Sequence, residues 1–343
     1  MPFFSITIPV YNVEKYIHQC LDSVMEQTFK DFEVIILDDG STDNSGNICD
    51  EYAHKDSRVK VIHDKNMGLL MARRRALQYV KGEYVLFLDS DDYWEKDLLE
   101  NIYNIFSENK IDMVFFRYKA VNAEGKELYQ QKKLLKDKEL ICDAGKFICY
   151  KIATSFEYNT MWLKCIKKDK IDIRADYSDV KDVSMGEDAL QSIKIAPNIG
   201  NMVYLDRPLY NYRVNISSIS TKITEKHLQD YLKVRTAVDD AMSTYYKKDS
   251  SEYIQKIEYD IRGFVGLLAD SAVSSLVVQP KWEKIKKEII TSELFWNISQ
   301  YKKQLSIISK VYIFVILKCK RVIWKILGHV KKILKYIYDR QNG

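Results

Sequence analysis

Short apolar runs and segments of helical period alternate along residues 4 to about 118. The apolar runs are rich in β-branched and aromatic residues, and continuous runs of this length are typical of strands buried on both faces of a sheet. These runs are Phe3–Val10, Glu33–Asp38, Val59–His63, Tyr84–Asp89 and Met113–Tyr118. Helical spacing is found between them, in Val13–Gln27, Ser45–His54, Leu69–Val80 and Asp97–Asn109. The repeated strand–helix–strand order predicts an α/β protein with a doubly wound, mostly parallel sheet.

The pattern becomes less regular after residue 118. A polar stretch covers Glu124–Glu139, and a helix is predicted near Glu187–Ile195. Short strands are predicted near Asn201–Leu205 and Leu209–Val214, and long helical patterns then run from residue 225 to about 290. A chain of 343 residues can form one large core or two domains. We expect an α/β domain over residues 1–220, a helical region over 221–300 and a tail helix over 301–343.

The tail differs from the rest of the chain in charge. Residues 301–343 hold eleven Lys and Arg against one Asp, a net charge of +10, whereas the whole chain has a net charge of +5. Apolar residues recur there with gaps of three and four from Val311 to Ile337, and the basic residues fall on the opposite side. Such an amphipathic helix suits the surface of an anionic membrane. There are two alternatives. The apolar side of the helix could pack on the protein itself while the basic side is solvated, or the basic side could bind nucleic acid. We do not expect nucleic acid to be a partner.

Several protein classes lack their signatures in this chain. The start, MPFFSITIPVYN, has neither the basic residues nor the cleavage site of an export signal, so we expect a cytoplasmic protein. Six cysteines form no C-x-x-C pair, and five histidines show no ligand spacing, which argues against a zinc site or a disulfide framework. Phosphate-binding loops of ATPases and of dinucleotide-binding proteins are not found in the sequence either.

Polar residues follow three of the predicted strands. They are Pro9–Asn12, Asp38–Ser41 and Asp89–Asp92, and the carboxyl ends of parallel strands are where α/β sheets bind ligands. Asp92 stands three residues before Glu95, the spacing of a capping box, so we expect it to cap the next helix. Asp89 and Asp91 could share a divalent cation with phosphate oxygens, although a solvated acidic turn explains an Asp-x-Asp pair equally well.

A second acidic pair, Glu187 and Asp188, begins the helix predicted at residue 187. Acidic side chains are favoured in a first helical turn by the helix dipole, which is a sufficient structural reason for them. The alternative is that one of them acts as a general base, because an ionised carboxylate can accept a proton at neutral pH. The residues alone leave both explanations open.

Residues 4–118 resemble the nucleotide-sugar-binding half of the family 2 glycosyltransferases. The resemblance rests on an opening Pro-x-Tyr-Asn, a DDGSTD element, a GLLMAR segment and the DSDD strand end, in this order. It implies the Rossmann-like GT-A fold, with residues 1–118 as the donor half and 119–220 as the acceptor half. Family-like roles follow for the donor site: Pro9 and Tyr11 at the base pocket, Asp38 at its wall, Asp39 on the uracil imide, Arg73 near the base or diphosphate, and Asp89 on the ribose or metal.

The resemblance also implies a cofactor and a catalytic base. Asp91, with Asp89, would bind Mn²⁺ or Mg²⁺ bridging the phosphates, and Asp188 would be the general base with Glu187 as its substitute. Trp162 and Lys164 would border the acceptor, and Tyr212, Arg213 and Ser218 would belong to a loop that closes over the diphosphate. The chain departs from the family in having Arg74 and Arg75 where Asn and a small residue are usual, and Leu163 where Asn is frequent.

The expected function is that of an inverting hexosyl- or N-acetylhexosaminyltransferase. It would move a sugar from a UDP-sugar to a saccharide acceptor at the inner face of the cell membrane. We expect this acceptor to be lipid-linked and to serve the synthesis of a bacterial capsule or exopolysaccharide. A nucleotidyltransferase also places acidic metal ligands beside an α/β sheet. A non-catalytic protein that binds nucleotide-sugar and membrane is the alternative from another class.

Overall fold

The computed structural model describes residues 1–108, 110–214, 225–273, 279–321 and 323–329. The chain divides into two compact units. The first comprises Met1–Phe147 and Thr160–Asn215, and the second comprises Ile148–Asn159 and Ile216–Gly343. We predicted that the α/β domain ends at residue 220. The division differs from this prediction because Ile148–Asn159, within the region predicted to be α/β, belongs to the second unit.

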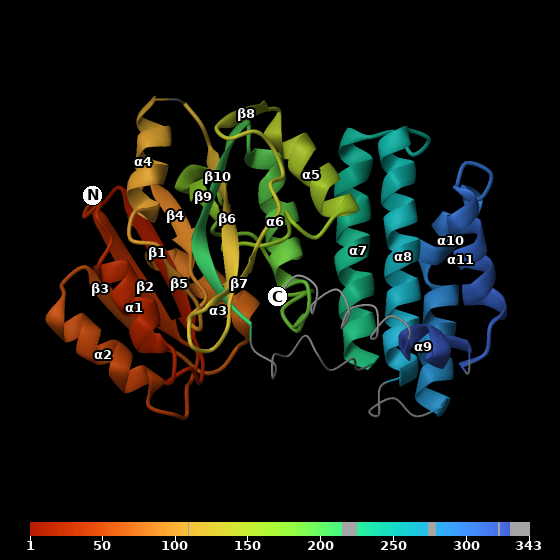
Figure 1. The fold of residues 1–343 in the computed structure, drawn as a ribbon, viewed down its shortest axis with the longest axis horizontal. Helices are drawn as coiled ribbons and strands as arrows, with labels where there is room; N and C mark the ends of the chain where they lie inside the picture. Colours follow the sequence, from red (N-terminus) through yellow and green to blue (C-terminus); the bar gives the residue numbers. More distant parts are fainter. Residues whose placement is uncertain (109, 215–224, 274–278, 322, 330–343) are drawn as a thin grey trace. The chain divides into compact units, whose positions relative to one another are not determined.

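The first unit is built around one sheet, to which ten of the described strands contribute (Figure 1). Its strand order is β3-β2-β1-β4-β9-β6-β10-β5, with β7 paired to β6 and β8 paired to β10. The strands are β1 Phe4–Val10, β2 Phe32–Asp38, β3 Val59–His63, β4 Tyr84–Phe87, β5 Tyr93–Trp94, β6 Met113–Val121, β7 Glu127–Gln130, β8 Glu139–Cys142, β9 Lys164–Lys167 and β10 Asn201–Arg213.

Half of this sheet agrees closely with the prediction. Strands β1, β2, β3 and β4 are parallel to one another, and every residue of β1 is buried, as expected for a strand covered on both faces. The other half is mixed. Strand β9 runs antiparallel between β4 and β6, and the polar stretch predicted at 124–139 contains β7 and β8. The two short strands predicted near residues 201 and 209 are one strand, β10, with register shifts after Tyr204.

Helices connect the strands of the first unit. They are α1 Ile17–Met25, α2 Ser45–Lys55, α3 Leu69–Ala76, α4 Leu98–Glu108, α5 Ala144–Thr154 and α6 Glu187–Ile195, and α5 continues into the second unit. Short 3₁₀ turns lie at Leu77–Tyr79, Lys168–Lys170 and Ala196–Asn198. The predicted capping role of Asp92 is wrong, because α4 begins six residues later, at Leu98.

The second unit is helical. Its helices are α7 Glu225–Tyr245, α8 Ser251–Val273, α9 Gln279–Thr291, α10 Glu293–Gln300 and α11 Ile307–Lys318. Buried charges join three of its segments. The Arg235 guanidinium in α7 donates to Asp260 Oδ1 in α8 at 2.5 Å and to the Ala153 carbonyl at the end of α5 at 2.7 Å. Since these side chains are buried, the ion pair fixes α5, α7 and α8 to one another.

Helix α11 belongs to the segment expected to form the basic tail helix. It contacts α8, and it buries Ser309, Ile313 and Ile316. Its opposite side exposes apolar side chains, namely Ile307, Ile308, Val311, Phe314 and Leu317, which we call the outer face of α11.

The prediction of one continuous helix from Val311 onward is wrong, because α11 ends at Lys318 and the backbone is extended at Cys319. The break is held from both sides: Lys286 Nζ donates to the Cys319 carbonyl at 2.8 Å, and Arg321 donates to the Ala272 carbonyl. Trp324 beyond it is completely buried. Val322 and the predicted positions from residue 330 lie outside the described residues. Within the part that is described, no helix combines the length and apolar character needed to cross a lipid bilayer.

Candidate active site

Three strand ends meet at one edge of the sheet, as the sequence predicts. In the parallel register Val10 pairs with Asp38, and Thr7 of the same strand pairs with Phe87 of β4. The Asp39 amide donates to the Val10 carbonyl at 2.8 Å, which continues the ladder by one residue. Tyr11, Asp39 and Asp89 therefore follow neighbouring strands at their carboxyl ends, where ligands bind in this class of sheet.

Asp39 holds the start of α3 beside β1 and β2. Its Oδ1 accepts from the Met67 amide at 2.7 Å and its Oδ2 from the Gly68 amide at 2.9 Å. Burial raises the pKa of Asp39, and the two amides oppose that shift. Tyr11 is 49% exposed, whereas Pro9 is buried within β1. The predicted contacts of Pro9, Tyr11 and Asp39 with a nucleobase stay predictions.

Asp38 faces in another direction. Its Oδ1 accepts from the Ser41 amide at 3.0 Å, and its Oδ2 lies 2.8 Å from His63 Nδ1. The other nitrogen of His63 lies 3.1 Å from Asp50 Oδ1 in α2. Both oxygens of Asp38 have partners within the fold, which favours a role in joining β2, β3 and α2 over the predicted role at the pocket wall.

Arg73 is the centre of the site. Its side chain is 1% exposed, and its guanidinium donates to Asp89 Oδ1 at 2.6 Å and to Asp188 Oδ1 by a short contact. Burial alone would lower the pKa of Arg73, but Asp188 and Asp89 together raise it. The charged guanidinium thus brings the acidic strand end and the acidic pair of α6 together. The predicted contact of Arg73 with the donor stays a prediction.

The acidic pair of α6 lies at the first turn of that helix. Gly186 precedes it with a φ of +90°, a left-handed conformation that favours glycine. Asp188 Oδ2 accepts from the Met161 amide at 3.3 Å, so each carboxylate oxygen of Asp188 has a donor. Burial, followed by the charge of Asp188, raises the pKa of Glu187 to about 7. Asp188 is therefore the better fixed of the two carboxylates.

The third aspartate of the strand end, Asp92, is a buried anchor. Its Oδ2 accepts from the Tyr210 hydroxyl at 2.8 Å, and its Oδ1 accepts from the Arg213 amide at 2.7 Å. Burial raises its pKa well above the ordinary range, and the charges of Asp91 and Asp89 add to the effect. Three aspartates can lie within four positions because Asp89 has Arg73 and Asp92 has two donors from β10.

Arg213 is buried behind the same strand end. Its guanidinium donates to the Asp91 carbonyl at 2.9 Å, to the Ala123 carbonyl at 2.8 Å and to Gln19 Oε1 at 2.5 Å. These contacts hold the backbone of the acidic turn. They do not correspond to the predicted closing loop over a diphosphate, for which Ser218 lies outside the described residues.

Asp91 is partly exposed, as is Asp89, whereas Asp92 is buried. The contribution of Asp91 to a metal site depends on further ligands, because no three His, Cys, Asp or Glu side chains of the described residues cluster to hold an ion. Carboxylate oxygens are nevertheless the ligands that Mg²⁺ and Mn²⁺ prefer, and Mg²⁺ commonly takes one or two of them plus phosphate oxygens. The donor set fits a cation that arrives with a diphosphate.

Lys164 does not border an open acceptor pocket, contrary to the prediction. It is 2% exposed, and its ammonium donates to the Thr160 carbonyl and, at 2.9 Å, to Ser192 Oγ in α6. Burial lowers its pKa to about 7, although the charge of Asp188 opposes this shift. Lys164 therefore supports α6 from inside the core. Trp162 is 9% exposed and lies against Tyr210 and Tyr212.

The three consecutive arginines of α3 point to different partners. Arg74 NH2 donates to the Asp172 carbonyl at 2.5 Å, and its guanidinium lies over the Tyr177 ring. Arg75 is half-exposed and pairs with Asp64 at 3.1 Å. Among the contacts of the described residues, Arg73 is the arginine of the three that reaches the acidic groups of the site. The sequence alone did not distinguish the three arginines, because consecutive side chains of a helix point in different directions.

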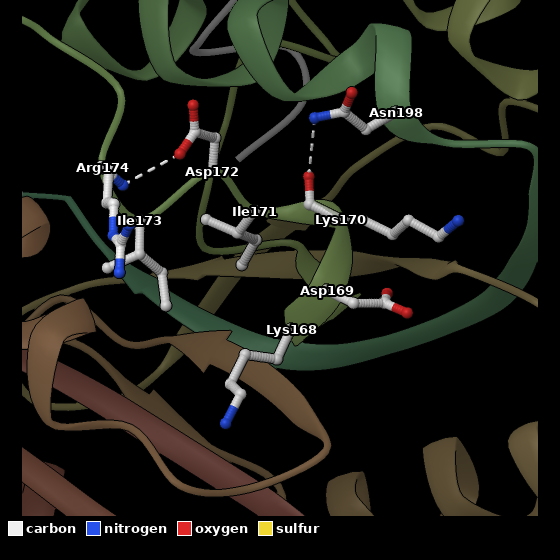
Figure 2. A pocket seen from close by; sticks show the side chains of 8 residues that line it. All are labelled: Lys168, Asp169, Lys170, Ile171, Asp172, Ile173, Arg174 and Asn198. Atoms are coloured by element: carbon white, nitrogen blue, oxygen red, sulfur yellow. Dashed lines mark hydrogen bonds between the residues drawn. The ribbon is translucent and has the colours of Figure 1, made fainter.

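A cavity of about 630 Å³ lies away from this site. It is lined by residues 168–174 and Asn198, and Figure 2 shows the Asn198 side chain donating to the Lys170 carbonyl. The Lys168 amide donates to the Glu83 carbonyl, just before β4, whereas Asp89 follows the other end of that strand. Because the cavity contains none of the predicted residues, we place the candidate active site at the strand ends instead.

Comparison with known sequences identifies the family. Residues 5–166 match the family model described as Glycosyl transferase family 2. This segment of the chain belongs to that family. Glycosyltransferase GlyA of Streptococcus pneumoniae serotype 4 is 32% identical over 279 residues, which are 78% of this chain and 39% of GlyA. EpsJ of Bacillus subtilis, described as an uncharacterized glycosyltransferase, is 27% identical over 262 residues, 74% of this chain and 75% of EpsJ.

Comparison with solved structures confirms the predicted GT-A fold. The structure of Staphylococcus aureus TarS residues 1–349 in complex with UDP superposes with a TM-score of 0.53 at 21% identity, covering 89% of this chain and 92% of TarS 1–349. The mannosyltransferase PcManGT of Pyrobaculum calidifontis, in complex with GDP-Man and Mn²⁺, has a TM-score of 0.51 at 14% identity, covering 97% and 87%. At these identities the likeness is one of fold.

Tyr210 is the residue of the site that sequence reasoning missed. Its hydroxyl accepts from the Asp89 amide at 3.3 Å and donates to Asp92, so it joins two of the three aspartates. The segment PLYNYR could have indicated Tyr210, because Tyr210 and Tyr212 are two residues apart and therefore share one face of a strand. Its partner across the sheet could not be known without the register.

Proposed function

We propose that this family 2 chain is an inverting glycosyltransferase that moves a sugar from a UDP-sugar to a hydroxyl of a saccharide acceptor. The observation that carries the proposal is the buried bridge from Asp89 through Arg73 to Asp188. It holds the acidic strand end, where a diphosphate is expected, beside a carboxylate that can accept a proton. Family membership supports glycosyl transfer, and the UDP in the TarS complex supports a uridine donor.

Asp188 is the general base in this proposal. The acceptor hydroxyl oxygen attacks the anomeric carbon, the bond from that carbon to the diphosphate oxygen breaks, and the electron pair leaves with UDP. Asp188 takes the hydroxyl proton. Arg73 and the Met161 amide orient its carboxylate for that transfer. A single displacement on the face opposite the leaving group inverts the configuration, so an α-linked donor gives a β-glycoside.

Mn²⁺ or Mg²⁺ would be held by Asp91, and by the oxygen of Asp89 that does not bind Arg73, together with the donor's phosphates. A divalent ion there supplies Lewis acidity that stabilises the negative charge on the departing diphosphate. The Mn²⁺ in the PcManGT complex supports this part of the proposal. The roles of Pro9, Tyr11 and Asp39 around the base belong to the same donor site.

The acceptor is proposed to be lipid-linked, in the synthesis of a cell-surface polysaccharide, with the protein bound to the inner face of the membrane. Two observations support membrane binding. The outer face of α11 exposes five large apolar side chains, and Phe314 among them is 61% exposed. Exposed lysines lie near them in the sequence, at Lys302, Lys303, Lys318, Lys320 and Lys325. Apolar groups edged by cations suit an anionic lipid surface.

The test is the release of UDP from a panel of UDP-sugars in the presence of Mn²⁺, with and without saccharide acceptors. We expect UDP release with at least one donor. Asp188→Asn should lower transfer about 10²- to 10⁴-fold, the usual contribution of general-base catalysis. UDP binding should survive, because the amide still accepts from Met161. Unchanged transfer by Asp188→Asn would overturn the assignment of the base.

The same assay separates the alternatives. A nucleotidyltransferase would release pyrophosphate from a nucleoside triphosphate and no UDP from a UDP-sugar. A non-catalytic binding protein would bind UDP-sugar without turnover, and Asp188→Asn would leave its cellular function intact. Family membership favours the transferase over both.

A further inference from the structure

Aromatic side chains gather on one face of the sheet beside the candidate active site. They come from three adjacent strands and from the segment before β9, and they are Tyr118, Tyr129, Trp162, Tyr210 and Tyr212. The register explains the grouping. Tyr118 of β6 pairs with Tyr210 of β10, and Ala120 pairs both with Tyr212 and with Tyr129 of β7. Since residues two apart point the same way in a strand, all four tyrosines share one face.

The rings form a connected layer. The Trp162 ring is parallel to that of Tyr212, with centroids 5.6 Å apart and an angle of 6°, and its centroid lies 4.5 Å from that of Tyr210. Tyr118 meets Trp162 edge-on at 5.3 Å, and Tyr129 meets Tyr118 edge-on at 6.5 Å. Exposure increases outward: Trp162 and Tyr210 are buried, Tyr118 and Tyr212 are intermediate, and Tyr129 is 48% exposed.

This layer adjoins the two reacting ends of the site. Trp162 directly follows Met161, whose amide donates to Asp188. On the other side the Tyr210 hydroxyl donates to Asp92 and accepts from the Asp89 amide. A molecule lying on the outer rings would therefore be next to the carboxylate that takes the proton and next to the strand end that faces the donor. In a direct displacement, that is the place of the acceptor.

We propose that Tyr118, Tyr129 and Tyr212 bind the acceptor by stacking against a pyranose ring. The inference rests on the proposed function and specifies its acceptor. A pyranose presents a patch of C–H groups on one side of its ring, and such a patch packs on aromatic carbon while the hydroxyls at its rim stay hydrated. A linear polyol phosphate has no such patch and would call for cations in place of rings.

Tyr129 is the residue to change, because it is the most exposed of the five and contributes least to the buried layer. Tyr129→Ala removes the ring, and Tyr129→Phe keeps the ring and removes only the hydroxyl. Leu128→Ala is the matched control, since Leu128 is the exposed neighbour in β7 whose side chain points to the opposite face.

The experiment measures binding of methyl β-D-glucopyranoside, methyl β-D-galactopyranoside and ribitol 5-phosphate to the full chain with UDP and Mn²⁺ present, by saturation-transfer NMR. We expect at least one pyranoside to bind through its C–H face. Tyr129→Ala should weaken it about three- to tenfold, the size of one aromatic contact, while Tyr129→Phe and Leu128→Ala bind as wild type. Pyranoside binding equal in wild type and Tyr129→Ala, binding of ribitol 5-phosphate alone, or no glycoside signal at all would overturn the inference.

UDP binding, followed separately by calorimetry, distinguishes this failure from that of the proposed function. If all the variants bind UDP and Tyr129→Ala loses only the glycoside, both proposals are supported. If wild type does not bind UDP, the transferase proposal fails first, whatever the glycosides do. If UDP binds normally and glycoside binding is the same with and without the Tyr129 ring, only the proposal of the stacking surface is wrong.

Discussion

A single guanidinium sets the geometry of the candidate site. Asp89 follows β4 and Asp188 begins α6, almost one hundred positions apart in the sequence, and their carboxylates would repel one another without a cation between them. Arg73 is suited to this position because its planar group offers several donors in fixed directions, whereas a lysine offers one charged centre. The buried charge is tolerated because both of its partners are also fixed.

Removing that charge should therefore destabilise the protein more than removing a neighbouring one. Arg73→Gln leaves two carboxylates facing each other with no cation, and breaking a buried ion pair in this way costs about 3–5 kcal/mol. Arg75→Gln is the matched control on the same helix. Its pair with Asp64 is partly exposed, and such pairs contribute about 0–1 kcal/mol. Urea unfolding measures both, and equal free energies of unfolding for the two variants would contradict the bridge.

Metal binding should depend on the nucleotide. Asp91 and one oxygen of Asp89 are too few ligands for a tightly held ion, and the described residues offer no cluster of three. Calorimetry with Mn²⁺ should give weak binding to the protein alone and binding at least about tenfold tighter with UDP, a difference of about 1.4 kcal/mol. Asp91→Ala should abolish the gain. Tight Mn²⁺ binding without UDP would show that the ion has other ligands.

At the scale of elements, His63 joins β3 to β2 and α2 through Asp38 and Asp50. The bond to Asp38 raises the pKa of His63 above its ordinary value, burial opposes this, and Asp50 adds to the rise. Because the folded state binds the proton more tightly, the stabilisation is complete below the unfolded pKa of about 6.5 and is lost as pH rises through the folded pKa.

The measurable result is a pH-dependent difference between two variants. The stability of wild type relative to His63→Gln should be largest below pH 6 and should decrease as pH rises through neutrality. The effect is small because the side chain is half-exposed. The measurement is the thermal midpoint of each protein across this pH range. If the midpoints of wild type and His63→Gln change with pH in the same way, the pair between His63 and Asp38 is not formed in solution.

Helices and strands with a clear hydrophobic pattern in the sequence were predictable. Elements that form only by pairing with other parts of the chain were not. Strands β1 to β4 and helix α6 could be read from the sequence, because a buried run or an amphipathic period is a local property. Strand β9 has only four residues, with lysine at both ends, and becomes a strand by pairing between β4 and β6. Asp92 has the spacing of a cap, and only the tertiary structure shows that its partners are on β10.

The site follows the same rule. Residue types and order made Asp89, Asp91 and Asp188 candidates, because a motif is local in the sequence, and the family resemblance then gave them their predicted roles. Arg73 could be singled out from its two neighbours only by resemblance, and its partners required the fold. Lys164 was misplaced because a lysine is usually on the surface, while this one is enclosed beneath α6. The proposed acceptor face could be recognised only from the register of three strands.

At the scale of the whole molecule, positive charge and exposed apolar groups both concentrate in the C-terminal part of the chain. Deleting everything after Gln300 would seem the direct test of membrane binding. It is not a clean one, because α11 and the segment after it contribute Ile313, Ile316 and Trp324 to the core of the second unit. Loss of binding on deletion could then reflect unfolding of that unit, so substitutions on the outer face of α11 are needed.

Phe314→Asp and Val311→Asp place a charge on that face without touching its buried side. Inserting a carboxylate among apolar groups opposes entry into lipid, and near anionic headgroups it adds repulsion. We expect either change to reduce co-sedimentation with phosphatidylglycerol vesicles by at least about tenfold, while donor hydrolysis continues, since the proposed catalytic groups lie in the first unit. Phe156→Asp is the matched control and should sediment as wild type, because Phe156 is comparably exposed but lies outside α11 in the sequence and its ring contacts Tyr259 of α8. Should both α11 variants remain on the vesicles, or wild type bind neutral phosphatidylcholine just as well, the lipid-facing role of this helix would have to be abandoned.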